Sequence, residues 1–203
     1  MNIKSLAAAL LLGLGSVTAW AAAAIGQPAP AFVGTDATGK AVSLADLRGK
    51  TVVLEWVNPG CPYVRKHYNV NNMQATQKGA VDRGVVWLAI NSTAKDASDY
   101  LTPERMSAWM KEQKASASAT VMDTDGRIGR AFGARTTPHM YVIDARGLLV
   151  YAGAIDNKPT PRSSDVAGAT NFVNQALAEV LAGKPVSTPA TQAYGCSVKY
   201  SAM

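Results

Sequence analysis

Cysteine and histidine are scarce in this chain. Its 203 residues include two of each, and the cysteines, Cys61 and Cys196, lie far apart in the sequence. Neither belongs to a Cys-x-x-Cys pair, so a local disulfide of that spacing is excluded. A structural zinc site takes four cysteine or histidine ligands, and we predict no metal and no cofactor.

Dense basic runs are also missing. The formal charge of +6 comes from lysines and arginines scattered along the chain. Nucleic-acid binding usually shows a basic stripe or an aromatic platform, and neither is visible. We therefore expect no nucleic-acid partner.

Only one long apolar run exists, and it is N-terminal. Lys4 precedes an Ala/Leu/Gly-rich stretch that ends in small residues, which predicts a cleaved signal peptide over residues 1–24. An uncleaved anchor over residues 6–24 is the alternative. Cleavage would leave a periplasmic or secreted protein without a membrane span: a domain over residues 25–183 and a tail over residues 184–203.

The central stretch of the chain is residues 52–68. An apolar run, residues 52–57, predicts a strand, and Asn58-Pro59-Gly60 predicts a turn. Pro62 suits the first position of a helix, which puts Cys61 beside the N-cap, where the helix dipole favours a thiolate. Arg65, one turn later, could add positive charge. An inert buried cysteine is the alternative.

The remaining pattern predicts an α/β protein with a central mixed sheet flanked by helices. Short strand candidates around residues 36–39 predict an N-terminal β-hairpin extension, and Thr102-Pro103 predicts a helix start. We expect the central helix to run to about Lys78, with Gly79 as its stop, and Ser43 to cap a short helical turn. Further strands are predicted at residues 85–90, 119–122, 140–143 and 148–151, and a last helix at residues 170–182.

The strand ending in Cys61-Pro62, followed by Thr137-Pro138 just before a hairpin, resembles the thioredoxin superfamily. The segments GTDATGKAVSLADLRGKTVVLEW and GARTTPHMYVIDARGLLVYAGAID are similar to its redoxin, or AhpC/TSA, branch, as are CPYVRKHY and the ending YGCSVKY. The resemblance covers residues 25–203. It implies a thioredoxin-like fold in which Pro138 is cis and faces Cys61.

Two departures from the family pattern affect the expected chemistry. Val64 replaces the second cysteine of the thioredoxin motif, and Asn58 stands where peroxiredoxins have a Thr or Ser. The strand position of the peroxiredoxin arginine falls near Pro138, so Arg65 or Arg135 would have to substitute.

The resemblance implies a thiol-dependent oxidoreductase, peroxiredoxin-like, with Cys61 as the nucleophile. Cys61 would attack a peroxide or the disulfide of a partner protein, and Cys196 is the only internal thiol that could resolve the product. A static disulfide or a spare thiol is the alternative for Cys196. A thiol reductant or a partner disulfide, and peroxide as a small substrate, are therefore the expected partners.

Several polar residues are candidates around the thiol. Pro62, Arg65, Thr137 and Pro138 would contact the substrate, with Thr137 offering its backbone. Asn58 could bond the thiolate, or merely form the turn. Glu55 could be a buried proton acceptor near the thiol or an edge-exposed residue. His139 could be a base or metal ligand, or merely a satisfied polar group at a strand start, and His67 is expected at the surface.

Two other classes of function stay open. A copper chaperone would use Cys61 with a histidine, although copper(I) prefers several sulfur ligands and no second cysteine is near in sequence. A non-catalytic binding module would keep a permanent Cys61–Cys196 disulfide.

Overall fold

The computed structural model describes residues 23–202, and the predicted signal peptide lies outside them apart from its last two residues. Within this described part, no helix is both long and apolar enough to cross a membrane. The predicted limits of the domain and of the tail stay predictions.

Five strands form a mixed central sheet, which confirms the predicted fold class. Its strand order is β5–β4–β3–β7–β8, with β3 parallel to β4 and antiparallel to β7. The strands are β3 (Val52–Trp56), β4 (Val86–Asn91), β5 (Ala119–Met122), β7 (His139–Ile143) and β8 (Leu149–Gly153). A small antiparallel pair, β1 (Val33–Thr35) and β2 (Ala41–Ser43), confirms the N-terminal hairpin.

Every residue of the central strand β3 is buried, because helices cover both faces of the sheet. The helices are α1 (Pro62–Asn69), α2 (Asn72–Val81), α3 (Pro103–Glu112), α4 (Arg127–Phe132) and α5 (Phe172–Leu181). One core contains residues of α1, α2, α3 and α5, and the other contains residues of α4 and the N-terminal segment. Cys61 belongs to the first core.

The predicted single helix after Cys61 was wrong. It is broken at Asn71, whose left-handed backbone (φ 61°) ends α1 and starts α2. Asparagine tolerates this conformation better than most residues. Gly79 lies inside α2, which continues to Val81, and a short 3-10 helix over Ala45–Leu47 begins after Leu44, not Ser43.

The start of α3 confirms its predicted cap. The hydroxyl of Thr102 accepts a hydrogen bond from the N–H of Arg105 (3.4 Å), and Pro103 occupies the first turn. Met106 and Met110 are buried on one face of the helix, so they are core residues.

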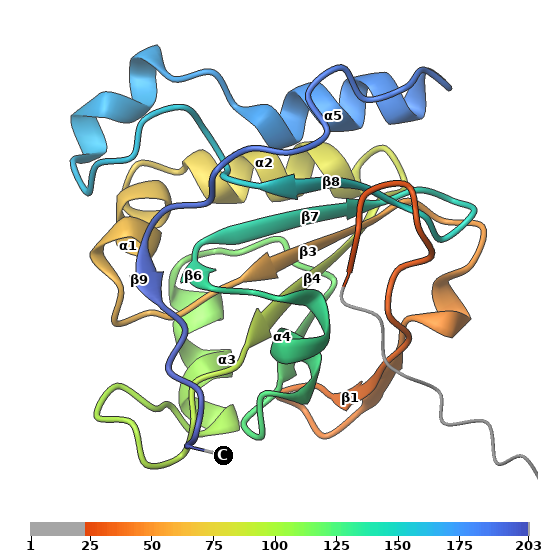
Figure 1. The fold of residues 1–203 in the computed structure, drawn as a ribbon. Helices are drawn as coiled ribbons and strands as arrows, with labels where there is room; N and C mark the ends of the chain where they lie inside the picture. Colours follow the sequence, from red (N-terminus) through yellow and green to blue (C-terminus); the bar gives the residue numbers. More distant parts are fainter. Residues whose placement is uncertain (1–22, 203) are drawn as a thin grey trace, which may run out of the picture.

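The C-terminal tail crosses the edge of the molecule where Cys61 lies. Figure 1 shows it leaving α5, passing α1 and reaching β6, and its path ends near α3. Two residues of the tail, β9 (Cys196–Ser197), pair antiparallel with β6 (Thr136–Thr137). This pairing joins the end of the chain to the loop before β7.

Candidate active site

The turn between β3 and α1 fixes Cys61 at the start of the helix. Cys61 is the N-cap residue of α1, with extended backbone angles (φ −82°, ψ 124°), and Pro62 follows it in the first turn. The N–H of Cys61 donates to the carbonyl of Asn58 (3.0 Å), and its carbonyl accepts from the N–H of Arg65 (3.0 Å). The predicted position at the positive end of the helix dipole is confirmed.

The thiol of Cys61 faces the loop before β7. Its Sγ donates a hydrogen bond to the carbonyl oxygen of Thr137 (3.1 Å), and the Thr137–Pro138 peptide bond is cis, as the resemblance implied. Only 1% of Cys61 is exposed. A protein partner therefore cannot touch the sulfur in this conformation.

The tail brings the second cysteine to the first. Cys196 lies opposite Thr137 in the β6–β9 register. Burial, then hydrogen bonding to Cys61 and its nearby charge, raises the pKa of the Cys196 thiol to about 12. Both cysteines are free thiols. Their proximity, which the sequence left open, is therefore a feature of the fold.

The side chain of Asn58 stabilises the turn between β3 and α1. Its Nδ2 donates to Asp99 Oδ2 (2.8 Å), and its Oδ1 accepts from the N–H of Gly60 (2.8 Å). Both polar atoms of the side chain are used within the protein, which favours the turn-forming alternative over a bond to the thiolate.

The two candidate arginines differ in what is bonded: the side chain of Arg65, but only the backbone of Arg135. Arg65 donates from Nε to the carbonyl of Pro59 (2.8 Å). Arg135 donates only its backbone N–H, to His139 Nδ1 (3.3 Å). Among the described residues, neither guanidinium has a hydrogen bond to a cysteine. Within residues 23–202, no arginine bonded to a thiol therefore stands in for the peroxiredoxin arginine.

His67 differs from expectation, whereas His139 is a satisfied polar group. The prediction that His67 is a surface residue was wrong: its exposed fraction is 0%, because the tail and the loop after β8 cover that side of α1. His139 stacks on the ring of Tyr141 (centroids 4.5 Å apart) and is bonded to the Tyr141 hydroxyl (3.2 Å). Burial lowers the pKa of each histidine to about 4.

Glu55 is completely buried, so the edge-exposed alternative was wrong. Its carboxylate accepts hydrogen bonds from Tyr68 (2.8 Å), Gln77 (2.9 Å) and Trp87 (2.8 Å). Burial nevertheless raises its pKa. The Cys61 thiol donates to Thr137 instead, so no direct proton path joins the thiol to this carboxylate.

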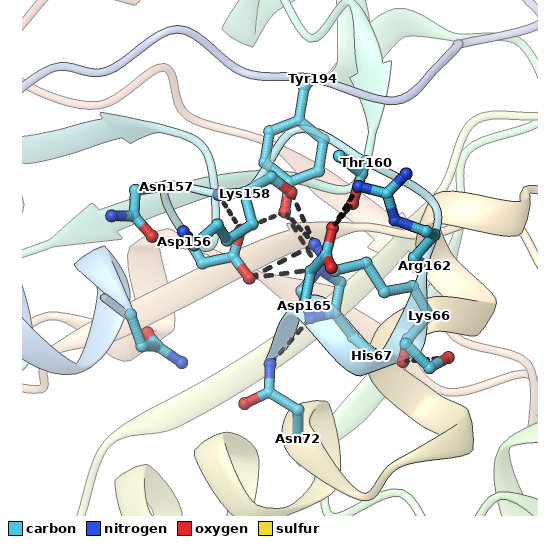
Figure 2. A network of polar contacts seen from close by, with 12 residues as sticks. Lys66, His67, Asn72, Asp156, Asn157, Lys158, Thr160, Arg162, Asp165 and Tyr194 are labelled. Carbon is cyan, nitrogen blue, oxygen red and sulfur yellow. Dashed lines mark hydrogen bonds and ion pairs between the residues drawn. The ribbon is translucent and has the colours of Figure 1, made fainter. Parts of the chain in front are cut away.

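A buried polar cluster next to the tail could not be foreseen from the sequence. We call Lys66, His67, Asp156 and Tyr194 the tail lock, because Tyr194 belongs to the tail and the other three to the domain; Figure 2 shows their side chains converging. The side chains of Lys66 and Asp156 are 0% and 1% exposed, with Nζ and Oδ2 3.6 Å apart. The sequence offers only a weak indication of this cluster, because Lys66 and His67 look like ordinary polar residues of α1.

A second sulfur that is distant in sequence does lie near Cys61, since Cys196 is opposite Thr137. Even so, no group of three or more His, Cys, Asp or Glu side chains comes together as a metal site within residues 23–202.

A curated relative shares much of the chain. The thiol:disulfide interchange protein DsbE of Pseudomonas aeruginosa is 27% identical over 140 residues, which cover 67% of this chain and 71% of the relative.

Two solved structures resemble the whole domain. A hypothetical protein from Sinorhizobium meliloti is 25% identical, with a TM-score of 0.75 over 90% of this chain and 98% of the other. An uncharacterized conserved protein from Geobacillus kaustophilus is 25% identical, with a TM-score of 0.76 over 89% and 94% of the two chains.

These likenesses agree with the thioredoxin-like fold built above, in which a strand, a cysteine and a helix precede a cis-proline hairpin. The model of the AhpC/TSA family matches residues 25–152, the part that contains Cys61 and Pro138. The chain therefore belongs to the AhpC/TSA family.

Proposed function

We propose that this protein is a thiol–disulfide oxidoreductase in which Cys61 and Cys196 form one dithiol–disulfide couple. The observation that carries the proposal is that both cysteines lie at Thr137: the Cys61 thiol donates to its carbonyl, and Cys196 is its partner in the β6–β9 pair. The Pseudomonas relative is a thiol:disulfide interchange protein, which supports the same class.

The positions of the two thiols suggest their order of action. The raised pKa of Cys196 keeps that thiol protonated at neutral pH, whereas Cys61 lies at the positive end of α1. Since the thiolate is the nucleophile, Cys61 attacks first.

In the proposed reaction, the Cys61 thiolate attacks one sulfur of a partner disulfide, and the other partner sulfur leaves as a thiolate. Cys196 then loses its proton and attacks Cys61, which releases the second partner sulfur. The net result is a Cys61–Cys196 disulfide and a reduced partner. Two electrons move from this protein to the partner, and the reverse steps oxidise a partner dithiol.

Peroxide is the other oxidant in the proposal. Attack by Cys61 on a peroxide oxygen would give a sulfenic acid and water or an alcohol, and Cys196 would then displace water to form the same disulfide. The absence of an arginine bond to a cysteine among the described residues, and the engagement of Asn58 with Asp99, favour the partner disulfide over peroxide. An exported location, from the predicted signal peptide, is part of the proposal.

The test compares two serine variants against a peptide disulfide and, separately, against limiting hydrogen peroxide. Cys61→Ser should lower the rate of oxidation by about a thousand-fold, because the nucleophile is gone. Cys196→Ser should still react but stop as a mixed disulfide on Cys61, detected by intact mass and peptide mapping. A Cys61→Ser protein that reacts as fast as the parent protein contradicts the proposal.

The relative rates with the two oxidants distinguish disulfide interchange from peroxide reduction. Fast oxidation by the peptide disulfide with slow oxidation by peroxide would support interchange. The opposite result would make the protein a peroxidase.

A further inference from the structure

The Cys61 sulfur is covered by the tail of its own chain. β9 lies against β6 with Cys196 opposite Thr137, the residue whose carbonyl accepts the Cys61 hydrogen bond. The N–H of Val198 continues this contact by donating to the carbonyl of Arg135 (3.0 Å). Main-chain bonds to a strand edge are also how an extended peptide adds to a protein. The tail therefore uses the contacts that a partner strand would need.

Gly195 makes this approach possible. Its φ is +135°, and a Cβ at this position would overlap the carbonyl oxygen of Thr137. Only glycine allows the backbone of the tail to come this close. The strand that presents a cysteine to Cys61 along this path therefore requires a glycine directly before that cysteine.

The tail lock holds the residue before this glycine. The Tyr194 hydroxyl donates to Asp156 Oδ1 and lies 3.2 Å from His67 Nε2 and 3.4 Å from Lys66 Nζ. Because Asn72 donates to His67 Nδ1 (2.8 Å), the ring proton is assigned to Nε2, which donates to Tyr194. One hydroxyl thus connects the tail to three buried side chains.

The rest of the lock depends on this connection. Lys66 Nζ also donates to the carbonyl of Lys158 (2.6 Å) and lies over the Tyr194 ring at 5.3 Å from its centroid. Asp156 Oδ2 is buried and, among residues 23–202, has no hydrogen-bond partner, although the Lys66 charge lies 3.6 Å away. Polar groups this buried are costly to leave without partners, so Tyr194 stabilises them as well as the tail.

A second, weaker anchor follows Cys196. Lys199 Nζ donates to Asp99 Oδ2 (2.6 Å), the same oxygen that accepts from Asn58. This pair is partly exposed to solvent. Cys196 is therefore held between a buried anchor at Tyr194 and a more exposed one at Lys199.

We propose that residues 194–197 occupy the place beside β6 that the cysteine-bearing strand of a partner protein would take. The tail lock controls how often these residues leave that place. The proposal rests on the proposed function, since it names the partner's chemistry: an extended segment with an aromatic residue, a glycine and a cysteine in sequence, which pairs with Thr136 and Thr137. When the tail leaves, Cys61 is open to that strand. When it returns, Cys196 meets Cys61.

Tyr194→Phe tests the lock, because it removes one hydroxyl and keeps the ring. Hydrogen–deuterium exchange should become about ten-fold faster in peptides that contain residues 193–199, with no change in β3 and β7. Alkylation of Cys61 by iodoacetamide should become faster by a similar factor in a Cys196→Ser background. Tyr141→Phe is the matched control, since this hydroxyl bonds Phe132 and His139 within the domain (3.1 and 3.2 Å). It should change neither readout.

These readouts need no redox activity, so they fail or succeed separately from the proposed function. Unchanged exchange in the tail together with unchanged alkylation in Tyr194→Phe would overturn the lock. Lys199→Met provides a second variant in case Tyr194→Phe does not fold, and it should accelerate both processes by about two- to three-fold. Equal rates in that variant and in the parent protein would also count against the proposal.

The proposed place of the partner strand is tested with peptides. In the Tyr194→Phe, Cys196→Ser protein, the disulfide dimer of the peptide Ala-Tyr-Gly-Cys-Ser-Val should form a mixed disulfide with Cys61 about ten-fold faster than Ala-Tyr-Ala-Cys-Ser-Val. A free cystine-type disulfide without flanking residues serves as the reference for intrinsic reactivity. Equal rates for the two peptides would show that a partner strand does not follow the path of the tail.

Discussion

The two cysteines of this protein are held by different kinds of structure. Cys61 sits in the hydrophobic core at a helix start, between the central strand and α1. Cys196 sits in a two-residue strand, held by side-chain anchors on either side. The difference matters for the proposed exchange reaction, in which Cys61 stays fixed while Cys196 withdraws to admit a partner.

The largest expected loss in the free energy of unfolding comes from breaking the buried Lys66–Asp156 pair of the tail lock. Lys66→Met leaves Asp156 as a buried carboxylate without its cation, and removing one member of a buried ion pair costs roughly 3–5 kcal/mol. Urea unfolding at pH 7 should show this loss in the free energy of unfolding. The matched control is Lys78→Met, whose pair with Asp82 is exposed and should be worth less than about 0.5 kcal/mol.

If Lys66→Met proved as stable as the parent protein, the buried anchor would not hold the tail by charge. A double variant that also carries Asp156→Asn should recover part of the loss, because it removes the unpaired carboxylate.

Low pH tests the same comparison through the two histidines, His67 in the tail lock and His139 at the start of β7. The pKa of His67 and of His139 is lowered to about 4 by burial, against an ordinary value of 6.5. Between these values the unfolded chain binds protons that the folded chain does not, so the free energy of unfolding falls as pH drops from about 6.5 to about 4. The loss should be ~3 kcal/mol for His67, and less for the half-buried His139.

NMR titration of the two imidazole rings measures this directly. Midpoints near pH 6.5 would contradict the burial of both rings. A His67→Gln variant should lose its share of the pH dependence of stability and keep that of His139.

The smallest expected effect on stability comes from Gly195→Ala, which acts on the approach of the tail to the Thr137 carbonyl. The added Cβ would overlap Thr137, and the strained backbone costs about 1–3 kcal/mol. Formation of the Cys61–Cys196 disulfide should slow by about ten-fold, while alkylation of Cys61 becomes faster. Gly168→Ala is the control, since nothing lies within 4 Å of a Cβ there. A disulfide that forms at the parent rate in Gly195→Ala would mean that the close approach of the tail is not required.

Local sequence determined a large part of this protein. The apolar run of β3, the turn at Asn58 and the proline after Cys61 together specify a strand, a turn and a helix start, because each depends on backbone preferences of neighbouring residues. The cap of α3 at Thr102 and the position of Pro138 before a hairpin were predictable for the same reason.

Only the tertiary structure decided the rest. The burial of His67, the enclosure of Glu55, the break at Asn71 and the meeting of Cys61 with Cys196 depend on which distant segments pack together. Helical spacing says which side of α1 a residue faces, but not that the tail covers that side. Because the contacts that bring Cys196 to Cys61 join residues far apart in the chain, no local pattern of sequence can specify them.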